Sequence, residues 1–454
     1  MDELWSAREF AGVDFGDARL GARLVTLANT FAEKPASSIP EACDAWAETK
    51  ATYRFFDNDR VSPAKILSAH TEATQRRVAD LSVVLSVQDT TTLNFTTHHN
   101  TKGLGPIGKA GLQGFFLHSA LAVSGTGVPL GLLAFEFLVR PEADSEGKKR
   151  TKTPPEERES ARWQRVLLAS TQKIPPGVPV ITVADREADY YDFLAAAVRS
   201  ELDILIRAKH DRRLVEEGNP RLREKLQAIP PIGATQQEIP RSGERSARTA
   251  TLEFRAAAIT FFAPGDPEHK GAPPLSMWAL LAQETSPVPE GEEPVDWLLL
   301  TTMPIPDFTC AQQLLLWYTY RWRIERFHYT LKSGCQTEKL QLETRERIER
   351  AVAVYAVVAW RLQMLTYLSR TVPDAPCTTV LCTSEWQALF CRIHKTANPP
   401  TTPPDLKTAV RWIARLGGFL GRRHDGDPGV KVLWRGFRAL YEVTVMWEIF
   451  RSKI

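Results

Sequence analysis

The sequence predicts an α/β protein in which a mixed β-sheet is flanked by helical regions toward both ends of the chain. Two observations support this prediction. From residue 81 to residue 207, apolar β-branched segments and helical segments alternate in the order β-β-β-α-β-α-β, which is typical of a mixed sheet with helices packed on it. Residues 311–371, in contrast, contain no proline and have a strongly helical pattern.

The individual elements follow from local patterns along the chain. Residues 1–70 are expected to be mostly helical, because Leu20, Leu24, Leu27 and Phe31 recur at helical spacing. Strands are predicted at 81–87, 115–123, 130–139, 178–185 and 203–207, with a helix at 160–172. Residues 211–300 combine short apolar segments with proline clusters, which indicates a β-rich insertion. A last helical segment, 406–450, is interrupted at Leu416-Gly417-Gly418.

Composition excludes several classes of protein. The chain has 454 residues, 43% of them hydrophobic, so it is expected to be globular, and its net charge of +3 identifies no partner. The longest apolar run, Val352–Trp360, is shorter than the ~20 residues of a bilayer-spanning helix, and the acidic N-terminus lacks the apolar core of a secretory signal. We therefore expect a soluble, cytoplasmic protein without a membrane partner.

The six cysteines do not suggest a disulfide framework in a chain of this length. Cys377, Cys382, Cys391 and His394 could be drawn as a zinc site. Their spacing matches no common zinc finger, however, and buried thiols are the commoner explanation.

Three carboxylates are candidates for a metal site. Asp89 and Asp185 each lie at the end of an apolar strand or just past it, where a sheet places polar side chains at the edge of a rigid scaffold. Glu325 is expected to approach on a helix packed against that sheet. Three convergent carboxylates suit two hard divalent cations, Mg²⁺ or Mn²⁺. Either aspartate alone could instead be a turn or helix cap.

The segment around Glu325 has a pattern of its own. At 100° per residue, Tyr318, Arg321, Glu325 and Lys332 share a narrow stripe on one side of a helix, and Ile324, Phe327 and Leu331 lie on the opposite, apolar side. A helix packed by its apolar side would present one carboxylate among groups that bind phosphate, as in a nucleic-acid active site. An ordinary i, i+4 salt bridge between Arg321 and Glu325 would give the same spacing.

These motifs resemble a known family. The pattern Tyr318-x₂-Arg321-x₃-Glu325-x₆-Lys332 resembles the YREK signature of the insertion-sequence-four family of bacterial DDE transposases. Asp89-Thr90-Thr91 and Asp185-Arg186-Glu187-Ala188-Asp189 resemble the regions of the two catalytic aspartates. Tyr53–Phe56, Trp297–Thr302 and Arg415–Phe419 are similar to segments of the Tn-five type of element, so the resemblance extends over nearly the whole chain.

The resemblance implies an RNase H-like catalytic core with the β-rich insertion before the glutamate helix. Asp89, Asp185 and Glu325 would be the catalytic residues and would hold two Mg²⁺ or Mn²⁺ ions. The residues implied to bind DNA are Tyr318, Arg321 and Lys332 near the cleavage site, Trp297 stacked on a flipped base, and Arg207, Lys209 and Arg186.

The resemblance also implies a division of the chain and an activity. Residues 1–70 would bind the transposon end, 71–371 would form the catalytic domain with its insertion at about 211–300, and 372–454 would dimerise. The expected activity is cut-and-paste transposition on double-stranded DNA, with inverted-repeat ends and target DNA held by a homodimer in a synaptic complex and the protein nucleoid-associated when bound. Two alternatives remain: a catalytically silent DNA-binding regulator, and a metal nuclease on the same fold that cuts without joining.

Overall fold

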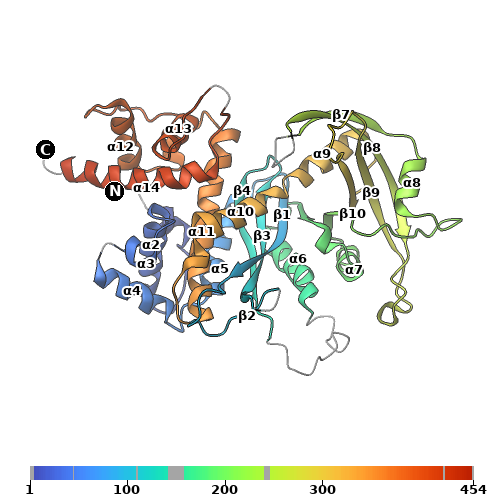
Figure 1. Cartoon of the computed structure of the whole chain (residues 1–454), viewed down its shortest axis with the longest axis horizontal. Helices are drawn as coiled ribbons and strands as arrows, with labels where there is room; N and C mark the ends of the chain where they lie inside the picture. Colours follow the sequence, from blue (N-terminus) through green and yellow to red (C-terminus); the bar gives the residue numbers. More distant parts are fainter. Residues whose placement is uncertain are drawn as a thin grey trace.

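A computed structural model describes residues 5–43, 45–108, 111–141, 158–239, 246–422 and 425–451. It is a mixed α/β structure in which a large twisted sheet is flanked by helical regions formed by the two ends of the chain (Figure 1). The first helices are α1 (Trp5–Glu9), α2 (Ala18–Glu33), α3 (Ile39–Ala42), α4 (Trp46–Phe56) and α5 (Pro63–Val78). The helical character expected of the N-terminal region is therefore confirmed.

In the described residues, ten strands form one sheet. They are β1 (Val84–Asn94), β2 (Gly105–Pro106), β3 (Gln113–Ser124), β4 (Pro129–Leu138), β5 (Val180–Ala184), β6 (Asp203–Arg207), β7 (Gly233–Ile239), β8 (Arg248–Phe261), β9 (Leu275–Glu284) and β10 (Asp296–Thr301). Their order is β2-β3-β1-β5-β6-β10-β9-β8-β7, with β4 paired to β3.

The centre of this sheet is an RNase H-like core. Strands β4, β3 and β1 are antiparallel neighbours, while β5 and β6 run parallel to β1, so the predicted mixed sheet is confirmed. The strands of the predicted insertion do not form a separate sheet. Instead β10 pairs antiparallel with β6, and β9, β8 and β7 extend the same sheet outward.

Helices cover the core strands where the chain returns to the sheet. The elements between the strands are η3 (Glu159–Ala161), α6 (Arg162–Gln172), η4 (Arg186–Ala188), α7 (Tyr191–Arg199), α8 (Leu222–Ala228) and η5 (Pro267–His269). One glycine allows an especially close contact: Gly131 of β4 has φ +149°, and a Cβ there would lie 1.9 Å from Thr74 Oγ1. Helix α5 can therefore rest directly on the sheet.

The C-terminal part of the chain is helical after β10. Its elements are α9 (Phe308–Thr319), α10 (Trp322–Tyr329), η6 (Thr330–Gly334), η7 (Thr337–Lys339), α11 (Arg345–Thr371), η8 (Cys377–Thr379), α12 (Thr383–His394), α13 (Leu406–Leu416) and α14 (Val430–Arg451). Helix α14 contacts α2, so the two ends of the chain lie side by side (Figure 1). All six cysteines are free thiols, and no group of three possible metal ligands, including one around Cys377, occurs in the described part of the chain.

Helix α11 is apolar on nearly all sides and passes through the middle of the molecule. It is the one helix of the described residues that is long and apolar enough to cross a membrane, but 83% of its most apolar window is buried inside the protein. A helix that is apolar all round is expected in the core of a large protein. We therefore interpret α11 as a core helix.

The single helix expected from Tyr318 to Lys332 is wrong in detail. Helix α9 ends at Thr319, α10 begins at Trp322, and Lys332 lies on the π-helical turn η6. The apolar side is as expected, because Ile324, Phe327 and Leu331 are buried. The polar residues of the stripe thus reach the sheet from three short helical pieces.

Candidate active site

Asp89 lies within a strand, which corrects its predicted place at a strand end. It is the sixth residue of β1, and its strand neighbour in β3 is Ser119. The parallel pairing of β1 with β5 nevertheless stops at Val87 and Val183. Asp89 therefore emerges just beyond the last residue at which the two central strands are joined.

The carboxyl group of Asp89 is in an unfavourable place for a negative charge. Burial, and next the charge of Asp185, raise the pKa of Asp89 to about 7, and Glu325 adds to the increase. The backbone N–H of Thr90 donates to Asp89 Oδ1 at 2.8 Å, which only partly offsets these effects. The charges of Asp185 and Glu325 therefore act on Asp89, although burial is the larger cause of its raised pKa.

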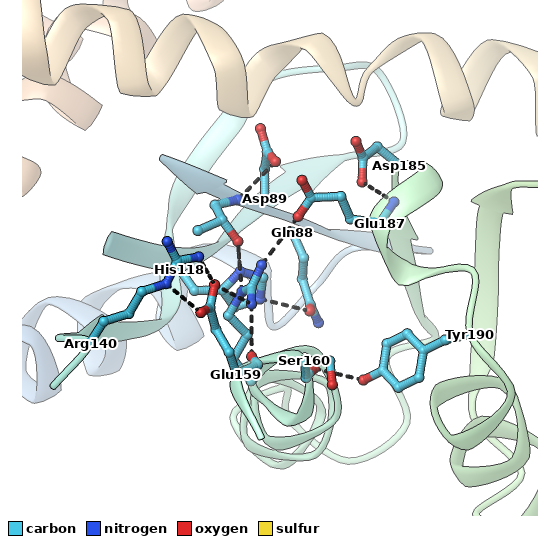
Figure 2. Close-up of polar contacts among 11 residues, drawn as sticks. Gln88, Asp89, His118, Arg140, Glu159, Ser160, Asp185, Glu187 and Tyr190 are labelled. Carbon is cyan, nitrogen blue, oxygen red and sulfur yellow. Dashed lines mark hydrogen bonds and ion pairs between the residues drawn. The ribbon is translucent and has the colours of Figure 1, made fainter. Parts of the chain in front are cut away.

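Asp185 follows β5 directly, as the sequence predicts. Its Oδ1 accepts a hydrogen bond from the backbone N–H of Glu187 at 2.8 Å and thereby caps the turn η4. The capping interpretation of Asp185 is thus correct without excluding a catalytic one. The carboxylates of Asp89 and Asp185 point to the same side of the sheet (Figure 2).

Glu325 approaches from α10, which packs against β1 and β3. Its Oε1 lies 2.6 Å from Nη1 of Arg321, so the i, i+4 salt bridge considered from the sequence is also present. No three His, Cys, Asp or Glu side chains of the described chain are gathered closely enough to hold a metal ion. The chemistry of the donor set still suits divalent cations, because all three side chains offer carboxylate oxygens and the charges of Asp185 and Glu325 contribute to the raised pKa of Asp89.

A cationic cluster lies beside Asp185. Burial lowers the pKa of Arg207, and the charges of Arg186 and Arg321 lower it further. Burial raises the pKa of Tyr318, which therefore keeps its phenolic proton beside Arg321, Arg207 and Asp185. Such a group of guanidinium and hydroxyl donors is suited to bind phosphate oxygens.

The remaining predicted DNA-binding residues are more widely spread. The Lys332 ammonium donates to the Thr92 carbonyl of β1 at 2.8 Å and lies 3.3 Å from Glu338 Oε1. Lys209 has an exposed side chain on the loop after β6. Trp297 is half-buried, and its ring meets that of Tyr318 edge to face with centroids 5.8 Å apart.

His328 is a member of the site that the sequence interpretation missed. Its Nε2 lies 2.8 Å from Ser119 Oγ, and its Nδ1 lies 3.9 Å from Asp89 Oδ2. Burial, and then the charge of Lys332, lower the pKa of His328 to about 3, so the ring is neutral at physiological pH. The signal available in the sequence was its position three residues after Glu325, on the same side of α10.

Comparison with protein families identifies the class of protein. Residues 151–360 match the model described as transposase DDE domain, which supports an enzyme of the polynucleotidyl-transferase type. Residues 2–61 match a transposase DNA-binding model, and residues 357–452 match the Tn5 transposase dimerisation domain. The chain belongs to the bacterial DDE transposases, whose DNA-binding and dimerisation domains indicate DNA binding and homodimer formation. The DDE match includes Asp185 and Glu325, whereas Asp89 lies outside it.

Proposed function

We propose that this transposase moves DNA by a cut-and-paste reaction in which Asp89, Asp185 and Glu325 are the catalytic residues. The observation that supports this most strongly is the placement of Asp89 in β1, Asp185 directly after the neighbouring strand β5 and Glu325 on α10, which packs against β1, with the charges of Asp185 and Glu325 both acting on Asp89. DDE domains generally use divalent metal ions. Two Mg²⁺ or Mn²⁺ ions held by these carboxylates would activate the attacking oxygen and stabilise the leaving oxygen.

The proposed reaction consists of four in-line displacements at phosphorus, each of which forms one P–O bond and breaks another. Water first nicks one strand at the element's end and releases a 3′-hydroxyl. That hydroxyl attacks the opposite strand and gives a hairpin end, which frees the element from the flanking DNA. A second water opens the hairpin, and the regenerated 3′-hydroxyl attacks target DNA.

The chain's own residues would position the DNA for these steps. Arg321, Arg207 and Arg186 would bind phosphates on the Asp185 side of the site, and Tyr318 would donate a hydrogen bond from its neutral hydroxyl. Lys332 would bind a phosphate close to the cleavage site, and Lys209 would contact the DNA from the loop after β6. Phosphate contacts of this kind give affinity that falls with salt, while the end sequence is read elsewhere.

Trp297 is proposed to stack on a base flipped out of the transposon end. Its ring is half-buried beside Tyr318, so one part of it packs in the core while the rest borders the site. Stacking of a base on an aromatic ring recovers about 1–3 kcal/mol, which offsets part of the cost of unstacking it.

The division of the chain into an end-binding domain (1–70), a catalytic domain (71–371) and a dimerisation domain (372–454) is part of the same proposal. The DNA-binding and dimerisation models match near the two ends of the chain, which supports this order. Two subunits would hold two inverted-repeat ends in a synaptic complex, nucleoid-associated in the cytoplasm.

The test is a cleavage assay on labelled duplex DNA that carries the inverted repeats flanking the gene. With Mg²⁺, the proposal predicts nicks, then hairpins, then joined products, and Asp185→Ala should abolish all three while DNA is still bound. Nicks alone would indicate a metal nuclease, and mobility shifts without cleavage would indicate a silent regulator. Either result would contradict the proposed reaction.

A further inference from the structure

Arg162 is a buried cation that contacts both aspartate regions of the active site. It is the first residue of α6, and its side chain is only 9% exposed. Its Nε donates to Thr90 Oγ1 at 3.0 Å, and its Nη2 donates to Glu187 Oε2 at 3.1 Å. Its Nη1 donates to the Glu159 carbonyl at 2.7 Å, so all three guanidinium nitrogens are engaged. Figure 2 labels two of its partners, Glu159 and Glu187, together with Asp89 and Asp185.

Two contacts of Arg162 lead to an aspartate through one further hydrogen bond each. Thr90, whose side chain accepts from Arg162, donates its backbone N–H to Asp89 Oδ1 at 2.8 Å. Glu187, whose side chain also accepts from Arg162, donates its backbone N–H to Asp185 Oδ1 at 2.8 Å. The guanidinium thus connects the two aspartates through one intervening residue on each side.

The sheet itself does not provide this connection. The parallel pairing of β1 with β5 ends at Val87 and Val183, two residues before each aspartate. Beyond that point, backbone hydrogen bonds no longer determine the separation of the two strands. A planar guanidinium with several donors in a fixed arrangement can supply the missing constraint.

The surroundings of Arg162 hold it in place. Arg140 pairs with Glu159 through two bonds of 2.7 and 2.8 Å, and Ser170 of α6 bonds to Ser86 of β1 at 3.0 Å. Thr90 Oγ1 also lies 2.8 Å from Nδ1 of the buried His118. These contacts hold the guanidinium of Arg162 in place without help from the carboxylates of Asp89 and Asp185.

We propose that Arg162 is a positioning residue that sets the separation of Asp89 and Asp185 before divalent cations bind. This inference rests on the proposed function, in which these carboxylates hold the metal ions. Groups that orient metal ligands typically contribute a factor of roughly 10 to 100 to metal affinity. Loss of Arg162 should reduce affinity by about that factor without removing a ligand.

The experiment measures Mn²⁺ binding to the full chain without DNA, from the electron paramagnetic resonance signal of the free ion. Arg162→Met should weaken binding about 10- to 100-fold. Arg165→Met is the matched control, because Arg165 lies one turn later on α6 and pairs with Glu136 at the surface. This control should bind Mn²⁺ like the wild type.

A second pair of variants keeps the test decisive if Arg162→Met fails to fold. Thr90→Val removes the hydroxyl that accepts from Arg162 with little change of shape, and Thr90→Ser retains it. Thr90→Val should bind Mn²⁺ more weakly than Thr90→Ser, with the melting temperature of each recorded in EDTA. Wild-type Mn²⁺ affinity in folded Arg162→Met, or equal affinity in the two Thr90 variants, would overturn the inference.

Failure of the proposed function would look different. If Asp89→Ala and Asp185→Ala themselves bind Mn²⁺ like the wild type, the carboxylates are not the metal site, and both proposals fall. If those two variants lose Mn²⁺ while Arg162→Met does not, only the role of Arg162 falls.

Discussion

Asp89→Asn should stabilise the metal-free protein at neutral pH although it removes a catalytic residue. Burial and the neighbouring carboxylates raise the pKa of Asp89 from 3.8 to about 7. In the unfolded chain this carboxyl ionises above about pH 3.8, but in the folded chain it ionises only near pH 7. The folded state therefore loses stability as pH rises through this window, and the full loss of about 4 kcal/mol applies above pH 7.

An asparagine at position 89 has no charge to lose and can still accept the hydrogen bond from Thr90. We expect Asp89→Asn to unfold with a free energy about 2–4 kcal/mol higher than the wild type at pH 8, and with nearly equal free energy at pH 4. The assay is urea unfolding in EDTA at both pH values. Asp374→Asn, a change at an exposed position, is the control and should show no pH-dependent gain.

Two results would refute this reasoning. Equal stability of Asp89→Asn and wild type at pH 8 would mean that Asp89 is not crowded by charge. A gain that persists undiminished at pH 4 would mean that the substitution acts through packing. Added Mg²⁺ should narrow the difference at pH 8, because it would bind the wild-type carboxylates and stabilise only that protein.

Three further predictions concern other parts of the molecule. Glu325→Gln should abolish cleavage of the labelled end duplex while leaving its gel-shift affinity within about twofold, since Arg321 and Lys332 remain to bind phosphates; retained cleavage would exclude Glu325 as a catalytic residue. Trp297→Ala should slow hairpin formation by the equivalent of about 1–3 kcal/mol in a time course, with nicking unchanged and Trp297→Phe intermediate; equal loss of both steps would indicate a packing role only. Glu9 is buried against His70 and Arg77. Burial alone would raise the pKa of Glu9, but the charges and hydrogen bonds of His70 and Arg77 outweigh it and lower that pKa from 4.5 to about 2. The stability that ionised Glu9 contributes should be fully present above pH 4.5 and should be lost as pH falls toward 2. Glu9→Gln should therefore lower the free energy of unfolding in urea by about 3 kcal/mol at pH 7 and by much less at about pH 2.5. A loss that does not depend on pH would contradict this prediction.

Much of the core could be predicted because its patterns are local. The apolar run before Asp185 ends where β5 ends, so the position of that aspartate follows from the sequence. Asp89 could not be placed so simply, because β1 continues for five residues beyond it by pairing with β3. The length of β1 depends on its pairing with β3, and the sequence of β1 alone does not predict which strand will pair with it.

The candidate active site could be predicted even less completely from the sequence. A helical wheel brings Tyr318, Arg321, Glu325 and Lys332 onto one stripe, but the chain breaks at Tyr320–Arg321 and forms a π-helical turn at Lys332. Arg162 carries no signal in the sequence, because its contacts with Thr90 and Glu187 form only once α6 packs against β1. Residues that act through tertiary contacts alone become visible only in the folded structure.

Asp89, Asp185 and Glu325 are proposed to form one metal site. The most direct test of this proposal is an anomalous difference map from crystals grown with Mn²⁺ and an end duplex. We expect Mn²⁺ peaks bounded by these three carboxylates, with Glu325 withdrawn from its 2.6 Å ion pair with Arg321. Peaks elsewhere, or an intact Arg321–Glu325 pair beside Mn²⁺ bound only by other groups, would contradict it.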